Sequence, residues 1–513
     1  MKNVLGREFP EYIEGYRKIK PFEGAFKNLG EREKVSVKVS SANPGDKKVL
    51  DSIDEALNKI DIKDGMTISF HHHLRNGDFV LNNVLYAIAK RGIKDITVAA
   101  SSIFPVHEPL VEHMKNGVVT GIVANYISGP VAKAISKGYL KKPAIMMTHG
   151  GRPRAIESGD LHIDIAFIGA PTADTYGNVN GVYGNAACGS LGYAICDAEY
   201  ADKVVAITDN LVPYPACPIE ISQIYVDYVV KVDSIGDPAG IVSGTTKITK
   251  DPVGLKIAKM ASQVIEASGL VKDGLSFQTG AGGTSLAVAA ELQSIMKKKN
   301  VVGSFAAGGV TGYIVDMLNE GLFRNIFDVQ CFDLKAVESY RDNKKHQGMS
   351  GSMYGNPHNK GAVVNNLDVM ILGATEIDTD FNVNVTTGSD GVIMGGSGGH
   401  SDTAAGAKLA IVVTNLIKGR LPIIKDRVTT VTTPGESIDV VVTERGIAVN
   451  PNRKDLIEKL KNTNLPVMTI EQLKEKAEKM TGKPEGLKFE DKIIAIVEYR
   501  DGTVIDVVKK PIE

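Results

Sequence analysis

The chain contains one segment twice, 204 positions apart. Residues 164–180 read DIAFIGAPTADTYGNVN and residues 368–384 read DVMILGATEIDTDFNVN, and 8 of the 17 positions are identical. Self-similarity at this distance predicts two related units of about 200 residues each, built on one fold. Related units usually meet face to face, and ligand sites favour interfaces between domains. We therefore expect the functional site where the two copies meet and have become different.

Both halves alternate short β-branched runs with helical stretches. In the first half we expect strands at Met66–Phe70, Ile96–Ala100, Gly121–Ala124, Ala144–Thr148, Ile163–Gly169 and Val204–Thr208, and a helix at Val80–Lys90. In the second half we expect helices at 253–268 and 285–297, and strands near 275–278, 301–305, 327–331, 368–373 and 409–414. This rhythm predicts an α/β fold of two open, mostly parallel sheets covered by helices.

The same patterns suggest domain boundaries. Residues 1–45 are charged and show no period, which predicts a peripheral arm. Residues 46–250 and 251–513 are then the two α/β domains. We assign to the second domain a helix at 470–480 and a C-terminal hairpin, in which Lys492–Glu498 and Thr503–Val508 flank the turn Asp501-Gly502.

Composition excludes several classes of protein. The chain is 43% hydrophobic and 23% charged with a net charge of −1, which predicts a soluble protein that binds neither nucleic acid nor a membrane surface. No apolar run is long enough for a spanning helix, and the N-terminal segment lacks the apolar core of a signal peptide. The four cysteines (188, 196, 217 and 331) have no metal-site spacing, so we expect free thiols in a reducing cytoplasm.

Two glycine-rich loops are candidate binding sites. The loop at 278–285 (QTGAGGTS) leads from a predicted strand into a predicted helix, where backbone N–H groups can hold an anion or a developing oxyanion. It lacks the third glycine and the acid of a dinucleotide fingerprint, and a simple tight turn remains the alternative. The segment 386–402 has six glycines in twelve residues, which favours close backbone approach. His400 and Asp402 in it could orient each other or a substrate, although no G-x-S-x-G elbow supports a triad.

In the first half, the loop equivalent to residues 278–285 is residues 70–78. It reads FHHHLRNGD, with histidine, arginine and asparagine where the second half has a glycine-rich sequence. Imidazole, guanidinium and amide groups suit carboxylate ligands. Since alternate strand residues face opposite sides, we select His71 and His73 from the triplet, together with Arg75 and Asn76. A second cluster, THGGRPR at 148–154, adds the candidates His149, Arg152 and Arg154. A metal-binding triplet, a purely structural loop and solvated arginines remain open alternatives.

Three strings carry a family resemblance: THGGRPRAIESGDLHIDIAFIGAPTADTYGNVNG, SYRDNKKHQGMSGSMYGNP and TTGSDGVIMGGSGGHSDTAAGAK. They resemble the alpha subunits of bacterial citrate lyase, and the resemblance covers essentially the whole chain. The stretch 395–402 is also similar to the GGxGGxxD loop of coenzyme A transferases and acyl-CoA hydrolases. The resemblance implies two related α/β domains with the active site between them.

The resemblance also implies an activity and partners. It implies a transferase that moves an acyl carrier from an acetyl thioester to citrate, giving citryl-carrier and acetate. The co-substrate is then the pantetheine-type arm of an acyl-carrier subunit, or coenzyme A as a surrogate, with no permanently bound cofactor and no metal. The implied partners are the beta (lyase) and gamma (acyl-carrier) subunits of citrate lyase, and a homo-oligomer is expected.

One departure from the wider family bears on mechanism. Many coenzyme A transferases use a glutamate nucleophile, but residues 303–315 contain no glutamate. We therefore predict direct attack of citrate on the thioester in a ternary complex. The predicted backbone donors are Gly280, Gly282, Gly283, Gly308 and Gly309; the predicted citrate ligands are His71, His73, Arg75, Asn76, His149, Arg152 and Arg154; and the predicted carrier-binding residues are Gly395, Gly396, Gly398, Gly399, His400 and Asp402.

Three rival interpretations remain. The first is a covalent-glutamate transferase or acyl-CoA hydrolase that uses Glu338 or Glu376. The second is an inactive scaffold of a lyase complex, which would leave the glycine loops unexplained. The third is a nicotinamide-dependent dehydrogenase, which the missing dinucleotide fingerprint argues against.

Overall fold

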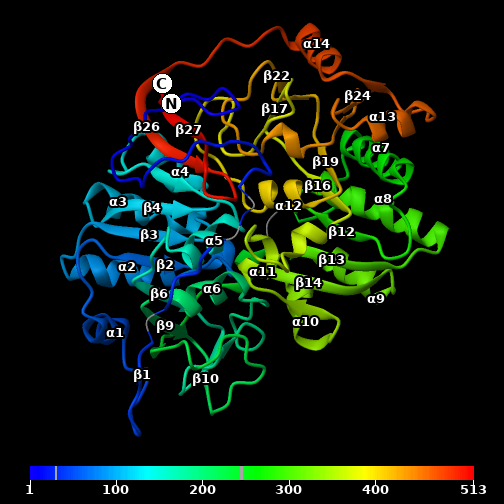
Figure 1. Cartoon of the computed structure of the whole chain (residues 1–513). Coiled ribbons are helices and arrows are strands. Elements are labelled where there is room, and N and C mark those ends of the chain that lie inside the picture. Colours follow the sequence, from blue (N-terminus) through cyan, green and yellow to red (C-terminus); the bar gives the residue numbers. More distant parts are fainter. Residues whose placement is uncertain (29, 31, 38, 243–245, 513) are drawn as a thin grey trace.

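A computed structural model describes residues 1–28, 30, 32–37, 39–242 and 246–512. Two large sheets lie side by side, the first in blue to green with the red C-terminal hairpin, and the second in green to orange (Figure 1). The ten-stranded sheet runs in the order β1 (Val49–Leu50), β11 (Tyr228–Lys231), β9 (Lys203–Thr208), β6 (Ile165–Gly169), β2 (Thr67–Phe70), β3 (Ile96–Ala100), β4 (Val119–Ala124), β5 (Ala144–Met146), β26 (Phe489–Glu498) and β27 (Val504–Pro511).

The nine-stranded sheet repeats this order. It runs β25 (Val467–Met468), β24 (Gly446–Val449), β23 (Val440–Thr443), β19 (Leu409–Val413), β16 (Val369–Leu372), β12 (Ser276–Thr279), β13 (Gly303–Val310), β14 (Phe323–Cys331) and β15 (His346–Gly348). From β11 to β5 and from β23 to β15, every neighbouring pair of strands is parallel. The predicted α/β fold of two related, mostly parallel sheets is confirmed.

The repeated segment forms the same structure in both halves. Each copy gives a sheet strand and then an antiparallel pair: β6, β7 (Thr172–Asp174) and β8 (Val179–Asn180) in the first, and β16, β17 (Glu376–Asp378) and β18 (Val383–Asn384) in the second. Asp174 accepts the N–H of Asn178 at 3.2 Å, and Asp378 accepts the N–H of Asn382 at 2.9 Å. A carboxylate that bonds backbone further along the chain fixes a turn, which explains why these aspartates and asparagines are identical in both copies.

The helices connect these strands and pack against the sheets. They are α1 (Ile53–Ile60), α2 (Val80–Lys90), α3 (Leu110–Lys115), α4 (Gly129–Ser136), α5 (Gly151–Ser158), α6 (Gly192–Tyr200), α7 (Pro252–Ser268), α8 (Gly283–Lys299), α9 (Gly312–Asn319), α10 (Leu334–Asp342), α11 (Gly351–Gly355), α12 (His400–Gly406), α13 (Lys454–Lys461) and α14 (Ile470–Thr481). Local sequence signals fix both ends of helix α7: the Asp251 side chain caps its first turn, and Gly269 in the left-handed region ends it. The largest core cluster draws buried side chains from both halves.

The C-terminal hairpin is where the predicted domain organisation needs a correction. The strand β26 pairs in parallel with β5, so the hairpin extends the sheet of the first half, although we assigned it to the second. In Figure 1 the red hairpin lies beside the cyan elements. The physical reason is that β5 would otherwise be a sheet edge, and Ala495, Ile496 and Val497 bury apolar side chains there. The boundaries at residues 45 and 250 stay predictions.

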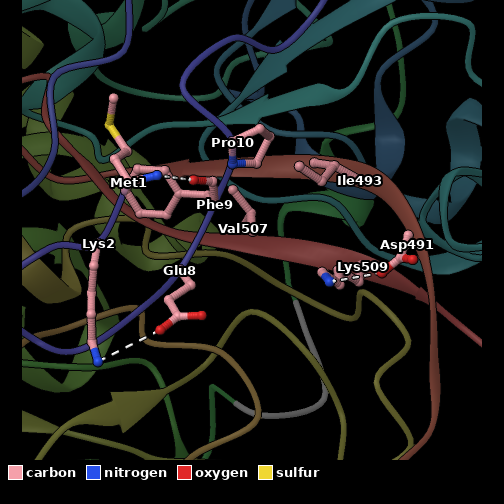
Figure 2. Close-up of a pocket in the computed structure, with 9 residues that line it drawn as sticks. All are labelled: Met1, Lys2, Glu8, Phe9, Pro10, Asp491, Ile493, Val507 and Lys509. Atoms are coloured by element: carbon pink, nitrogen blue, oxygen red, sulfur yellow. Dashed lines mark hydrogen bonds and ion pairs between the residues drawn. The ribbon is translucent and has the colours of Figure 1, made fainter.

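The N-terminal arm packs on this hairpin. Phe9, Ile13, Tyr16 and Ile19 form a small apolar cluster with Ile496 and Val504. A surface cavity of about 570 Å³ lies between arm and hairpin (Figure 2). Its charged side chains already pair with one another, Lys2 with Glu8 at 3.6 Å and Lys509 with Asp491 at 3.2 Å. No predicted site residue lines it, so the cavity is not a candidate for the chemistry.

No helix in the described part of the chain is long and apolar enough to cross a membrane. The four cysteines are free, and three of them are buried.

Candidate functional site between the two halves

Loops that follow strands of both sheets meet along one contact surface. We call it the seam; it joins residues 71–75, 101–104, 125–126, 148–150 and Tyr193 of the first half to residues 330–332, Tyr354 and 395–402 of the second, and Gln278, Gly308 and Gly309 pack against these second-half residues. The backbone N–H of His149 donates to the carbonyl of Gly398 at 2.7 Å, and Gly398 donates to Asn125 at 3.1 Å. In α/β folds ligands bind at the carboxyl ends of parallel strands, so the seam is the candidate functional site.

His71 and Arg152, two of the predicted citrate ligands, are engaged with a buried carboxylate. Both side chains point to Asp197: the guanidinium of Arg152 makes two bonds of 2.6 Å to its carboxylate, and Nε2 of His71 lies 3.1 Å away. All three side chains are almost completely buried, and the cationic Arg152 holds the pKa of Asp197 well below its usual range. This ion-pair cluster is a structural support under the loop.

His72, which the sequence analysis did not select, is a histidine of the triplet that lies in the seam. The strand β2 ends at Phe70, so the rule that alternate residues share a face no longer applies to the triplet. The ring of His72 stacks at 4.9 Å on Tyr193 and at 5.7 Å on His149. Its backbone carbonyl accepts a bond of 2.7 Å from Gln330 of the second half. His72 therefore lies at the centre of the seam.

Arg75 is the cation of the seam. Its guanidinium carbon lies 5.4 Å from the ring of Phe104 in the first half and 4.7 Å from the ring of Phe332 in the second. Its Nη1 is buried without a hydrogen-bond partner, and no carboxylate among the described residues forms an ion pair with it. A fixed cation without a counter-ion is a natural receptor for a substrate carboxylate.

His73 and His149 bring two more unpaired polar atoms to the same place. Nε2 of His73 and Nδ1 of His149 are buried without a hydrogen-bond partner. Burial lowers the pKa of His149 to about 3 and that of His73 well below its usual value, so both rings are neutral at pH 7. These two predicted residues are brought together with Arg75.

Arg154 and Asn76 lie elsewhere. Nη1 of Arg154 bonds to Asp160 at 2.7 Å, and its guanidinium packs against Gly502 in the hairpin turn. Asn76 is exposed, and its Oδ1 accepts the backbone N–H of Val106 at 3.0 Å. Neither side chain joins Arg75 in the seam.

The predicted glycine donors divide into two groups. In the loop before α8, the N–H of Gly280 already donates to the carbonyl of Ile371 at 3.0 Å, which removes it as a free donor, while Gly282 and Gly283 begin the helix. Gly308 and Gly309 lie at an irregularity between β13 and β14. A Cβ on Gly308 would lie 2.4 Å from Nε2 of Gln278.

Gly309 has a comparable packing role. A Cβ on Gly309 would lie 2.1 Å from the ring of Phe332. Both glycines thus make room for seam side chains, Gly308 for Gln278 and Gly309 for Phe332. Gln278 donates to Oη of Tyr354 at 2.8 Å, and its Oε1 is buried without a partner.

The glycine-rich segment at 395–399 runs between the two halves. A Cβ on Gly396 would lie 2.4 Å from the carbonyl oxygen of Asn125, and one on Gly399 would lie 2.3 Å from Oη of Tyr354. Gly395 accepts a bond from the N–H of Ile127 at 3.1 Å. The close approach that the sequence indicated is approach to the first half at Gly395 and Gly396, and to Tyr354 of the same half at Gly399.

His400 and Asp402 do not pair with each other. His400 bonds to Thr433 at 2.7 Å and to the carbonyl of Gly373 at 2.9 Å. Asp402 crosses the seam, where it accepts bonds from Oγ1 of Thr148 at 2.8 Å and from the N–H of Gly150 at 2.9 Å. Burial raises the pKa of Asp402 to about 6. A Ser–His–Asp triad built on these two residues is excluded by this geometry.

The two glutamates of the rival interpretation lie in different settings. Glu338 is exposed on α10. Glu376 is fully buried in β17, pairs with Lys425 and accepts bonds from Asn384, Ser389 and Thr429 at 2.8–3.0 Å. A carboxylate with every oxygen engaged is a poor nucleophile.

Two groups of described residues have donor atoms close enough for a metal: Asp328, Cys331 and His346, and the more exposed His162, Asp164 and Asp202. In the buried group the donors bond to each other, Cys331 to Asp328 at 3.0 Å and His346 to Asp328 at 3.1 Å. The polar atoms of this cluster therefore have hydrogen-bond partners within the cluster. The absence of a resident metal stays a prediction.

Several residues of the seam were not predicted: Ser101, Phe104, Tyr193, Phe332 and Tyr354, while Gln278 was named only as the start of the loop at 278–285. Most of these side chains reach the seam only through the fold. Phe104 and Phe332 had one available signal, since each closely follows a predicted strand whose carboxyl end reaches the seam.

Comparisons with known proteins show the family of the chain. A family model described as "Citrate lyase, alpha subunit" matches residues 46–511. The citrate lyase alpha chain of Haemophilus influenzae is 51% identical over 463 residues, which are 90% of this chain and 93% of that protein. A crystal structure of an alpha subunit of citrate lyase from Streptococcus mutans, in complex with citrate, is 52% identical, covers 100% of both chains and has a TM-score of 0.96.

A more distant structure shares the fold alone. The 4-hydroxybutyrate CoA-transferase of Porphyromonas gingivalis is 17% identical, covers 84% of this chain and 97% of that chain, and has a TM-score of 0.54. The fold of two related α/β halves is thus that of the coenzyme A transferase class. Within it, the chain belongs to the citrate lyase alpha subunit family. It is a transferase, the citrate CoA-transferase subunit of citrate lyase.

Proposed function

We propose that the chain transfers an acyl-carrier thiol from an acetyl thioester to citrate by direct attack of citrate, without a covalent enzyme intermediate. The observation that carries this proposal is Arg75, a fixed cation at the centre of the seam that pairs with no carboxylate among the described residues. The Streptococcus mutans relative, which is described in complex with citrate, supports citrate as the acid. His73 and His149 supply neutral polar groups beside the cation.

The chemistry needs no protein nucleophile. An oxygen of a citrate carboxylate adds to the acetyl thioester carbonyl, and the tetrahedral intermediate expels the carrier thiolate to leave a citryl–acetyl anhydride. The thiolate then adds to the citryl carbonyl and expels acetate, which keeps the bridging oxygen that came from citrate. Both attacking groups are anions, so positioning and oxyanion stabilisation supply the catalysis.

The settings of the carboxylates support this route. Residues 303–315 contain no glutamate, Glu376 has both oxygens engaged, and Glu338 is exposed on α10. A covalent-glutamate transferase or an acyl-CoA hydrolase remains the second candidate.

The carrier and partners follow from family membership. We propose that the co-substrate is the pantetheine-type arm of an acyl-carrier (gamma) subunit, with coenzyme A as a surrogate, and that no cofactor is permanently bound. The citryl-carrier then passes to a beta (lyase) subunit, and the alpha subunit forms a homo-oligomer. The free cysteines support a reducing cytoplasm as the compartment.

A single-turnover isotope experiment tests the mechanism. Enzyme in excess is mixed with acetyl-CoA and citrate labelled with ¹⁸O in its carboxylates, and acetate and thioester products are analysed by mass spectrometry. Direct attack predicts citryl-CoA and acetate carrying one ¹⁸O atom in the first turnover. A covalent glutamate predicts unlabelled acetate in that turnover, with the label retained on the enzyme and a borohydride-trapped adduct on one glutamate.

A panel of acids tests the substrate. Citramalate, acetoacetate and succinate replace citrate in otherwise identical reactions. Citrate alone should give the acyl-CoA product. Acetate formed at the same rate with no acid present would instead identify an acyl-CoA hydrolase.

A further inference from the structure

The loop after β2 holds His72 at three points. Its backbone N–H donates to Oγ of Ser101 at 3.1 Å, and its ring Nδ1 lies 2.5 Å from the same oxygen. Its backbone carbonyl accepts the bond from Gln330 across the seam. The position of the residue therefore depends on both halves of the molecule.

The ring orientation is fixed by packing. Tyr193 stacks on the His72 ring at an interplanar angle of 23°, and Phe104 covers it at 5.9 Å. A ring held between such neighbours cannot turn about its χ2 bond without displacing them. The position of Nε2 is therefore as well fixed as that of the His72 backbone.

The hydrogen bonds favour one position of the ring proton of His72. Oγ of Ser101 already accepts the His72 N–H, and its own hydrogen has no other acceptor among the described residues. When that hydroxyl donates to Nδ1, the ring proton resides on Nε2. Nε2 itself has no hydrogen-bond partner in the described part of the protein, so its N–H remains free for a ligand.

The ring stays neutral at working pH. Burial lowers its pKa well below 6.5, and His149, His73, Arg75 and His71 around it act in the same direction. A neutral N–H donor keeps its hydrogen when charge develops on its acceptor, and it competes less than a cation would for the carboxylates of citrate.

We propose that His72 is the oxyanion donor of the transfer reaction, with Ser101 as the residue that positions it. This inference rests on the proposed function. As the citrate oxygen bonds to the thioester carbon, the carbonyl π electrons move to oxygen, and Nε2–H of His72 donates to that oxyanion. The electrons return when the carbon–sulfur bond breaks and the thiolate leaves, so no proton is transferred. The free N–H of His72 supplements the glycine donors, of which Gly280 is already bonded.

The test compares two substitutions that differ in where they place an amide N–H. The nitrogen of glutamine in His72→Gln reaches close to the former Nε2, whereas that of asparagine in His72→Asn reaches only as far as Nδ1. Loss of one oxyanion donor typically lowers kcat by about 10²–10³-fold. We expect this loss in His72→Asn with the KM values for citrate and acetyl-CoA within about three-fold, and at least a ten-fold recovery of kcat in His72→Gln.

Ser101→Ala tests the positioning role with the ring left in place. We expect a lower kcat, unchanged KM values and no shift of the pH profile, because the ring remains neutral. His162→Asn, on the exposed His162, is the matched control and should behave as wild type. Thermal unfolding of each variant shows whether its fold is kept.

The possible outcomes separate this inference from the function it rests on. Wild type that makes no citryl-CoA overturns both. Active wild type together with a folded His72→Asn of nearly normal kcat overturns the role of His72 alone. Equal loss in the Asn and Gln variants with raised KM values would show that the ring only packs. If His72→Asn does not fold, a normal kcat in Ser101→Ala overturns the inference.

Discussion

Arg75 is the side chain on which the proposed binding of citrate most depends. Its backbone has a positive φ of 51°, which is unusual for a residue other than glycine, and its guanidinium lies between aromatic rings from the two halves. Such a conformation costs of order 1–3 kcal/mol and persists where surrounding structure enforces it. The strain, the missing counter-ion and the position at the seam agree on a binding role.

Replacing this arginine tests that role. We expect Arg75→Ala to raise the KM for citrate by roughly 10–100-fold, because one charge-assisted hydrogen bond contributes about 1.5–3 kcal/mol. The KM for acetyl-CoA should change little. Initial rates at varied citrate and fixed acetyl-CoA give the comparison, with Arg91→Ala on the exposed pair with Asp54 as the control. Unchanged citrate kinetics would remove Arg75 from the site.

At this scale the sequence predicted residue types better than individual positions. It selected the loop at 71–76 because that loop departs from its glycine-rich counterpart, and Arg75, His73 and His149 are indeed together. It chose His71 over His72 because the strand was assumed to continue past Phe70. It could not predict that Arg152 forms an ion pair with Asp197, because that pairing depends on the fold.

Elements of the two halves also meet at a buried acid. Oε1 of Glu220 accepts the backbone N–H of Leu191 at 2.6 Å in the first half and Oη of Tyr340 on α10 at 3.1 Å in the second. Its Oε2 is buried without a partner, and burial raises the pKa of Glu220 to about 7. The contact between the halves therefore holds a carboxyl group that takes up a proton more readily than in the unfolded chain.

Glu220→Gln should change how stability depends on pH. The folded protein binds this proton more tightly than the unfolded chain, so wild type loses stability as pH rises from about 4.5 to about 7. The glutamine variant lacks this loss, and its stability relative to wild type should increase by up to about 3 kcal/mol between pH 4.5 and 8. Urea unfolding at both pH values measures the change.

The exposed Glu338 of the neighbouring α10 provides the control for that experiment. Glu338→Gln removes an exposed carboxyl group from α10 and is unfolded at the same two pH values. A Glu220→Gln variant that behaves in the same way would mean that Glu220 titrates normally in the folded protein.

At the scale of the whole molecule, the C-terminal residues pack against the first half of the chain. The C-terminal hairpin completes the sheet of the first half through β5, and the N-terminal arm packs on the hairpin (Figure 1). The first half is therefore built from both ends of the chain, with the second half inserted between them.

Removing the hairpin should damage the half that is distant in sequence. We expect a chain that ends at residue 485 to lose hydrogen-exchange protection in β4 and β5, whose neighbour has gone, while β12, β13 and β16 keep theirs. A Gly-Ser insertion after residue 484, which keeps the hairpin, is the control. Loss of protection confined to the second sheet would return the hairpin to the second half.

The sequence by itself determined the parallel α/β halves, their internal repeat and the loop that carries Arg75. These follow from signals between near neighbours, such as apolar periodicity, helix caps and the aspartate turns of the repeat. Only the tertiary structure decided which cations stay unpaired and what the glycine segment touches. Those outcomes depend on partners far along the chain, as Asp197 and Arg152 are 45 positions apart and Asp402 and Thr148 are 254 apart. Local patterns carry no information about such pairs until the fold brings them together.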